Sequence, residues 1–310
     1  MTRLDRRKFI LGALAVPSGA ALLAACGGDA DSVSTGQGSA ADPTSSGLPE
    51  PSTDLSFLVP TFPDGFRSPA AIVAGVEQRI TFVVRDEIDI MRQTAPSELA
   101  FTVSLGDVAF ADETVRLRSD GVITPYYPIR FTAPQPGEYV ATLVDHPGVT
   151  PIPFVVMDPA DGTIPQVGDT LPVVDTPTID DARGVTPICT RAIQCPFHEH
   201  NLTDMIGNGR PTVLIIATPG FCQTDICGPV VDLLIDGAEG HDDIDFIHAE
   251  VYGDPSEFDT GAFPDTTAAV KAMGLPYEPA LFVTDANGIL AARLDTMWDR
   301  SELADALAVL

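Results

Sequence analysis

Two cysteines, Cys222 and Cys227, are the residues in this sequence whose type and spacing could do chemistry. They follow residues 212–217, an apolar and β-branched run that predicts a buried strand. Pro219 and Gly220 break the run, and apolar side chains recur at helical spacing from residue 229 onward. Unpaired N–H groups in the first turn of a helix lower the pKa of a thiol there. We therefore expect a lowered pKa for Cys227, with Cys222 within reach for a disulfide.

A second cysteine pair, Cys189 and Cys195, lies upstream of this strand and is followed by His198 and His200. A structural disulfide between Cys189 and Cys195 is the interpretation we favour. A metal site made by these two cysteines and two histidines is an alternative, but the spacing matches no common zinc pattern. Disulfide exchange with the Cys222/Cys227 pair is a third. We therefore expect neither a metal nor a cofactor.

The elements around the cysteines alternate between strand and helix patterns. Residues 244–251 predict a strand, 265–273 a helix, 280–284 and 289–294 a hairpin joined by a turn at 285–288, and 301–309 a closing helix with Asp299 as its cap. This order predicts a mixed sheet covered by helices.

Residues 165–310 resemble the thioredoxin superfamily. The sequence VGDTLP at 167–172 is similar to the opening of peroxiredoxin-like and TlpA-like members, and EPALFVTD at 278–285 is similar to the strand that carries the cis-proline of the family. The resemblance implies that Pro279, rather than Pro276, is cis and packs beside the cysteine pair. It also implies that Cys222, Cys227 and Pro279 form a catalytic group.

The cysteine spacing departs from the CxxC of the family, because Val230 stands where its second cysteine would be. The redox potential and the identity of the attacking thiol therefore stay open. The leading function is that of a thiol–disulfide oxidoreductase; the alternative is a non-enzymatic binding or scaffold lipoprotein with structural disulfides. A thiol peroxidase, with Arg293 supporting the thiolate, and a Sco-like copper chaperone are further alternatives. The copper alternative lacks a histidine at 274–278, and we expect His248 to be a core or edge residue.

The first half of the chain predicts an all-β domain. Short β-rich segments separated by Asp, Gly and Pro clusters occupy 55–60, 78–85, 99–105, 113–118, 127–132, 138–144 and 153–157. The turn and tyrosine at 134–139 resemble those of immunoglobulin-like and cupredoxin-like sandwiches. One histidine, His146, and no cysteine argue against a cupredoxin copper site. We predict two domains: an immunoglobulin-like β-sandwich at 55–158, serving as a spacer or interaction module, and an α/β thioredoxin-like domain at 159–310.

The N-terminus predicts export. Arg6 and Arg7 form a twin-arginine motif within a signal peptide at 1–25, and residues 23–26 look like a bacterial lipobox in which Cys26 is lipidated. Residues 26–54 are rich in Gly, Ser and Ala and predict a disordered tether. We expect a cell-envelope protein that its lipid anchors to the outer face of the cytoplasmic membrane.

The formal net charge of −27 argues against nucleic-acid binding and against adhesion of the folded part to anionic lipid. The leading function and the export signals together predict envelope proteins with thiols or disulfides as partners. Because the charge disfavours other contact with lipid, we expect membrane contact through the N-terminal lipid only.

Overall fold

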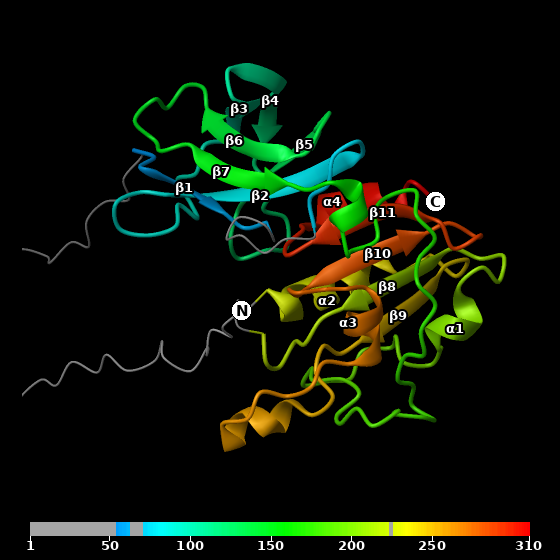
Figure 1. The fold of residues 1–310 in the computed structure, drawn as a ribbon. Helices are drawn as coiled ribbons and strands as arrows, with labels where there is room; N and C mark the ends of the chain where they lie inside the picture. Colours follow the sequence, from blue (N-terminus) through cyan, green and yellow to red (C-terminus); the bar gives the residue numbers. More distant parts are fainter. Residues whose placement is uncertain (1–53, 63–70, 223–225) are drawn as a thin grey trace, which may run out of the picture. The chain divides into compact units, whose positions relative to one another are not determined.

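The computed structural model describes residues 54–62, 71–222 and 226–310, which belong to one compact unit, Glu50–Leu310 (Figure 1). The predicted signal peptide, Cys26 and nearly all of the predicted tether lie outside the described residues. Within the described residues, no helix has both the length and the apolar character needed to cross a membrane. The described chain is mostly β-structure with few helices.

Seven strands in the first half form two antiparallel sheets with the orders β1-β2-β5 and β4-β3-β6-β7. The strands are β1 (Phe57–Pro60), β2 (Glu77–Arg85), β3 (Glu98–Leu105), β4 (Val108–Arg116), β5 (Tyr127–Thr132), β6 (Gly137–Leu143) and β7 (Ile152–Val156). Six agree with the predicted segments to within about two residues. β4 starts earlier than predicted, because its exposed first half pairs with β3 around a bulge at Val103 and Ser104 and has no buried periodicity.

Aromatic side chains fill the core of these sheets. The rings of Phe82 and Phe101 stack with their centroids 5.6 Å apart, and the ring of Phe154 stacks on that of Tyr139 at 6.0 Å. The Tyr139 hydroxyl donates a hydrogen bond to the carbonyl of Gln135, 2.8 Å away. A tyrosine bonded to the backbone a few residues upstream is a feature of immunoglobulin-like sandwiches.

The second half contains a mixed sheet in the order β11-β10-β8-β9, in which β8 and β9 are parallel and the other pairs antiparallel. In chain order, the helices and strands of the second half are η3 (Pro159–Asp161), α1 (Leu202–Met205), β8 (Thr212–Ile216), α2 (Cys227–Gly237), β9 (Asp245–Ala249), η4 (Pro255–Thr260), α3 (Ala268–Ala272), β10 (Ala280–Thr284), β11 (Leu290–Asp295) and α4 (Arg300–Leu307). The predicted order of strands and helices is confirmed.

Two local contacts set helix boundaries. The Asp299 side chain caps α4 by accepting a hydrogen bond from the N–H of Glu302, 2.9 Å away, as predicted. Helix α3 begins later than the predicted residue 265, because Thr266 pairs with Tyr252 in a β-bridge and is held extended.

A long segment between η3 and α1, residues 162–201, contains neither helix nor strand. It nevertheless has buried side chains, including Cys189, Cys195, Phe197 and His198. Segments of this length without helix or strand are uncommon in compact domains, and those that occur are usually functional or disordered. Because side chains of this segment are buried, contacts other than the hydrogen bonds of a helix or strand must hold it in place.

Buried polar contacts connect the first half of the chain to the second. Arg79 of β2 pairs with Glu302 of α4 at 2.5 Å and donates to the carbonyls of Asp295 and Met297. Arg293 of β11 donates to the carbonyls of Ala71 and Pro165 and pairs with Asp295 at 3.0 Å, whereas the thiol-peroxidase alternative expects it beside a thiolate. The division into two domains stays a prediction, because the described residues form a single compact unit.

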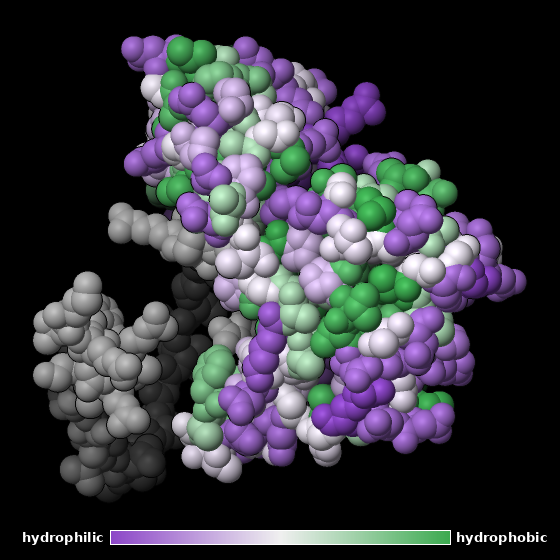
Figure 2. All heavy atoms as spheres, turned by 45° about the vertical axis from the view of Figure 1, so that its right-hand side comes forward, coloured by the Kyte–Doolittle hydropathy of each residue, from purple (hydrophilic) through white to green (hydrophobic). Residues whose placement is uncertain are grey.

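The exposed surface mixes polar and apolar residues. On the face shown in Figure 2, hydrophobic patches are interspersed among hydrophilic residues. Exposed large hydrophobic side chains in the second half include Phe221, at 38% exposure, and Phe263, at 72%. These two rings belong to an aromatic cluster with Phe258 and Tyr252, and Phe221 directly precedes Cys222 in the sequence.

Candidate functional site

The thiols of Cys222 and Cys227 lie together at the start of α2. Cys227 is the first residue of the helix and is fully buried, whereas Cys222 is half-buried. The main-chain N–H of Cys227 donates a hydrogen bond to Cys222 Sγ, 3.3 Å away. This N–H is one of the unpaired donors of a helix N-terminus, and it favours negative charge on the sulfur of Cys222 rather than on its own side chain.

The carboxyl group of Glu278 completes this site. Its Oε2 atom accepts hydrogen bonds from Cys227 Sγ at 3.5 Å and from the N–H of Thr218 at 2.8 Å. Burial, followed by the charge on Cys222, raises the pKa of Glu278 from 4.5 to about 7. A carboxyl group with this pKa can exchange a proton with a thiol near neutral pH.

Glu278 was not recognised in the sequence as a site residue, although it precedes Pro279. The Glu278–Pro279 peptide bond is cis, as the motif predicts, and the bond before Pro276 is not. The cis-proline motif could have identified Glu278. The resemblance places Pro279 beside the cysteines, and Glu278, which is bonded to Pro279, is then expected to lie near them as well.

The expected lowering of the Cys227 pKa is wrong. The hydrogen bond with Cys222, burial and the charge of Glu278 all raise the pKa of Cys227. The position at the helix N-terminus was predicted correctly, but the thiol faces the protein interior, where desolvation disfavours its charged form. Burial decides whether the pKa of Cys227 is raised or lowered, and the position of the residue in the sequence does not reveal how deeply it is buried.

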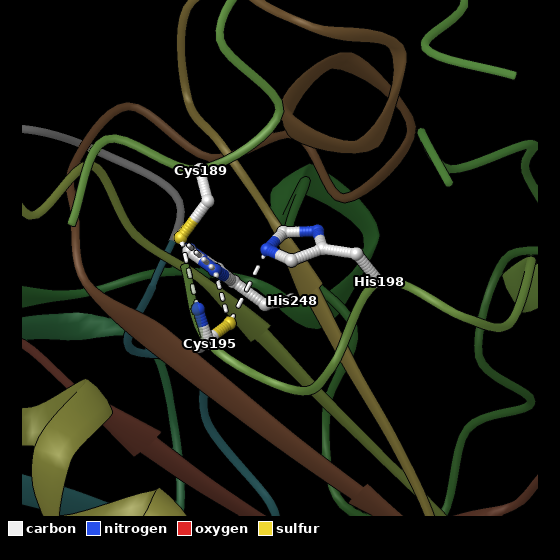
Figure 3. A group of neighbouring side chains, drawn as sticks. All are labelled: Cys189, Cys195, His198 and His248. Carbon is white, nitrogen blue, oxygen red and sulfur yellow. Dashed lines mark hydrogen bonds between the residues drawn. The ribbon is translucent and has the colours of Figure 1, made fainter. Parts of the chain in front are cut away.

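A second group consists of Cys189, Cys195, His198 and His248, all buried (Figure 3). One sulfur or nitrogen atom from each lies within 4.8 Å of the others. Cys195 Sγ is 3.2 Å from His198 Nε2 and 3.3 Å from His248 Nδ1, and Cys189 Sγ is 4.0 Å from the same His248 nitrogen. We call these four residues the Cys2His2 cluster.

The Cys2His2 cluster differs in one histidine from the metal site that the sequence offers as an alternative. His200 is exposed, and His248 of β9 takes its place. Sequence proximity suggested His200, whereas the fold brings His248 to the cysteines because the main-chain N–H of His248 bonds the carbonyl of Phe197 at 2.9 Å. The interpretation of His248 as a core histidine gave its burial correctly but missed its neighbours.

Cys189 and Cys195 are free thiols in the structure, and their disulfide stays a prediction. The main-chain N–H of Cys195 donates to Cys189 Sγ at 3.4 Å. The hydrogen bond between the two side chains lowers the pKa of Cys189 and raises that of Cys195. This contact favours one thiolate in the pair.

Thr190 connects the Cys2His2 cluster to the Cys222/Cys227 site. Its hydroxyl accepts a hydrogen bond from the N–H of Gly220 at 2.9 Å and bonds the carboxyl of Glu250 at 3.1 Å. A Cβ atom on Gly220 would lie 2.7 Å from the carbonyl oxygen of Thr190. The segment that carries Cys189 therefore packs directly on the turn that leads to Cys222.

The comparisons with known proteins assign no family to this chain. No protein-family model and no curated protein matches the sequence. One solved structure, described as MTB dsbF in its mixed oxidized and reduced forms, is similar at 17% identity with a TM-score of 0.31. The match covers 46% of this chain and 98% of the other. The site is therefore interpreted from its own geometry.

Proposed function

We propose that this protein is a thiol–disulfide oxidoreductase in which Cys222 attacks and Cys227 resolves. The observation that carries the proposal is the asymmetry of the two thiols. Cys222 is partly accessible and receives an N–H bond at its sulfur, whereas Cys227 is fully buried against Glu278. An accessible, stabilised thiolate is suited to attack a disulfide, and a buried neighbour is suited to resolve the product.

The exchange proceeds in two displacements when a partner disulfide is reduced. The Cys222 thiolate attacks one partner sulfur, forming a mixed disulfide and releasing the other partner sulfur as a thiolate that takes a proton from solvent. Cys227 then transfers its proton to the Glu278 carboxylate, and its sulfur attacks Cys222 Sγ. The second partner sulfur leaves as a thiolate. Two electrons have passed to the partner, and Cys222 and Cys227 share a disulfide; the reverse sequence oxidises a partner dithiol.

Trapping of the mixed disulfide tests the assignment of the two thiols. We expect the full-length Cys227→Ser variant to accumulate a mixed disulfide with a model disulfide protein, because the resolving sulfur is missing. The Cys222→Ser variant should trap at least tenfold less, because the remaining thiol is buried and protonated. Non-reducing gels and mass spectrometry of the adduct measure both.

The control is the double variant Cys222→Ser/Cys227→Ser, which should not trap the partner, because the other two thiols of the described residues, Cys189 and Cys195, are buried. Equal trapping by both single variants would contradict the assigned roles. A reduction potential of the Cys222/Cys227 pair below about −300 mV would indicate a structural disulfide and reject the proposed activity.

The twin-arginine and lipobox motifs support an extracytoplasmic setting for this activity, with the protein attached by lipid at Cys26 to the outer face of the cytoplasmic membrane. The partners that we propose are envelope proteins with thiols or disulfides. In this arrangement the sequence 26–54 acts as a tether that gives the site its reach.

A further inference from the structure

The segment at residues 162–201 carries two buried thiols and one buried imidazole but no helix or strand to hold them. Its backbone bonds include those from the N–H of Ile179 to the carbonyl of His198 and from the N–H of His248 to the carbonyl of Phe197. These two bonds place His198 against β9, beside His248. The Cys2His2 cluster thus lies where an otherwise irregular segment meets the edge strand of the sheet.

We propose that Cys189, Cys195, His198 and His248 bind one Zn²⁺ ion. Two sulfur and two nitrogen ligands around one point are the donor set of closed, four-coordinate structural zinc sites. The four side chains come from two elements and point toward one another (Figure 3).

The distances fit a tetrahedral ion. Zn–S bonds of about 2.3 Å and Zn–N bonds of about 2.0–2.1 Å place sulfur and nitrogen ligands about 3.5 Å apart. The observed sulfur–nitrogen distances are 3.2, 3.3 and 4.0 Å. Shifts of a few tenths of an ångström at the side chains would complete the coordination.

Contacts outside the cluster orient two of the ligands. His248 Nε2 lies 3.0 Å from the carbonyl oxygen of Ala217, which only accepts, so Nε2 carries the proton and Nδ1 is free to bind a metal. The N–H of Cys195 donates to Cys189 Sγ and stabilises a thiolate there. His198 directs Nε2 to the sulfurs, while its buried Nδ1 has no hydrogen-bond partner among the described residues.

Charge balance also favours a divalent ion. Zinc binds cysteine as the thiolate, so two cysteine ligands and one Zn²⁺ sum to zero charge, which suits a site whose four residues are all buried. Bound zinc would fix the segment that packs on Gly220, and with it the turn before Cys222. The site is thus structural and distinct from the thiols that we propose for catalysis.

Metal content of the purified full chain tests the proposal. Protein refolded with Zn²⁺ under a thiol reductant, then passed over a desalting column, should retain about one equivalent of zinc. The variants Cys195→Ser and His248→Asn should bind zinc at least tenfold more weakly. His200→Asn, which changes the exposed neighbouring histidine, and the double variant Cys222→Ser/Cys227→Ser should retain zinc like the wild type.

Co²⁺ in place of Zn²⁺ provides a readout that does not depend on variants that fold. The wild-type protein should show the visible absorption of tetrahedral Co²⁺ with thiolate-to-metal charge transfer. Absence of bound metal, or a Cys189–Cys195 disulfide in peptide maps of the refolded, metal-treated protein, would overturn the proposal. Loss of zinc in the His200→Asn variant, or in the Cys222→Ser/Cys227→Ser variant, would reject these four ligands. Either result leaves the trapping experiment on Cys222 and Cys227 unaffected.

Discussion

Glu278 places a carboxyl oxygen 3.5 Å from the sulfur of Cys227, and its chemistry follows from its surroundings. Burial and the nearby charge of Cys222 favour the protonated form. The carboxyl group can therefore take a proton from Cys227 and return it, provided that its pKa is close to the pH of the reaction. At the residue scale, the site depends on this one carboxyl group as much as on the two thiols.

The raised pKa of Glu278 predicts a pH-dependent loss of stability. Between 4.5 and about 7 the folded state binds more protons at this group than the unfolded state. The free energy of unfolding therefore decreases as pH rises through that range, by about 2 kcal/mol after allowance for partial solvent exposure. The variant Glu278→Gln should lack this decrease in urea titrations of the reduced protein at pH 4.5 and pH 7.5.

The same substitution should slow resolution of the mixed disulfide at least tenfold, because Cys227 loses its proton acceptor. Glu257→Gln, at an exposed carboxyl group in η4, is the matched control and should behave like the wild type in both assays. A Glu278→Gln variant with an unchanged pH profile would contradict the raised pKa.

At the scale of elements, the close contact between the turn before Cys222 and the segment around Thr190 is the feature that couples the two sites. Gly220 donates its N–H to the Thr190 hydroxyl, and the Thr190 carbonyl lies where a side chain on Gly220 would begin. The contact leaves no room for a Cβ atom and thus requires glycine.

The variant Gly220→Ala should lower the free energy of unfolding by about 1–3 kcal/mol, because the new Cβ would meet a backbone oxygen at 2.7 Å. Chemical denaturation of the reduced protein measures the change. Gly228→Ala is the control: it adds a Cβ in α2 with nothing within 4 Å and should be neutral or stabilising. Equal effects of the two substitutions would show that the Thr190 contact is not tight.

At the scale of the whole molecule, a buried ion pair joins β2 to α4. The Arg79 side chain is 4% exposed and that of Glu302 2%, and the Tyr126 hydroxyl donates to Glu302 at 2.5 Å. Burial is the largest single effect and raises the pKa of Glu302, but the Arg79 charge together with the hydrogen bonds from Arg79 and Tyr126 outweighs it, and the pKa is lowered. This contribution to stability is present above the unfolded pKa of the carboxyl group and is lost as pH falls through its folded pKa.

The variant Arg79→Met should destabilise the protein by about 3–5 kcal/mol, because it removes the buried counter-ion of Glu302 and leaves the more exposed Arg130, 3.5 Å away, to balance the charge. Arg92→Met, in an exposed pair with Asp89 at 3.3 Å, should cost less than about 1 kcal/mol. Urea unfolding followed by the far-UV signal and by the single tryptophan, Trp298, measures both. Equal losses of unfolding free energy in the two variants would contradict the proposal that the buried pair stabilises the packing of β2 on α4. The wild-type protein should unfold in one transition by both probes.

Local sequence patterns predict most of the local structure. Apolar runs predicted β8, β9 and β10, the Asp-Ala-Asn-Gly turn predicted the β10–β11 hairpin, and Asp299 predicted the start of α4. These features depend on side-chain periodicity, turn chemistry and capping, which act over a few residues. The family resemblance also directed attention to Pro279 and to the thiols at the start of α2.

Only the tertiary structure decided which residues surround the thiols and how they are charged. Glu278 is 51 residues from Cys227, and His248 is 53 from Cys195, so neither contact follows from local pattern. The pKa of Cys227 is raised by its hydrogen bond with Cys222 and by burial, although its position at the helix N-terminus predicts a lowered pKa. Long-range contacts and desolvation are set by the pairing of β8 with β9 and β10 and by the packing around these strands, which bring together chain segments that the sequence keeps apart.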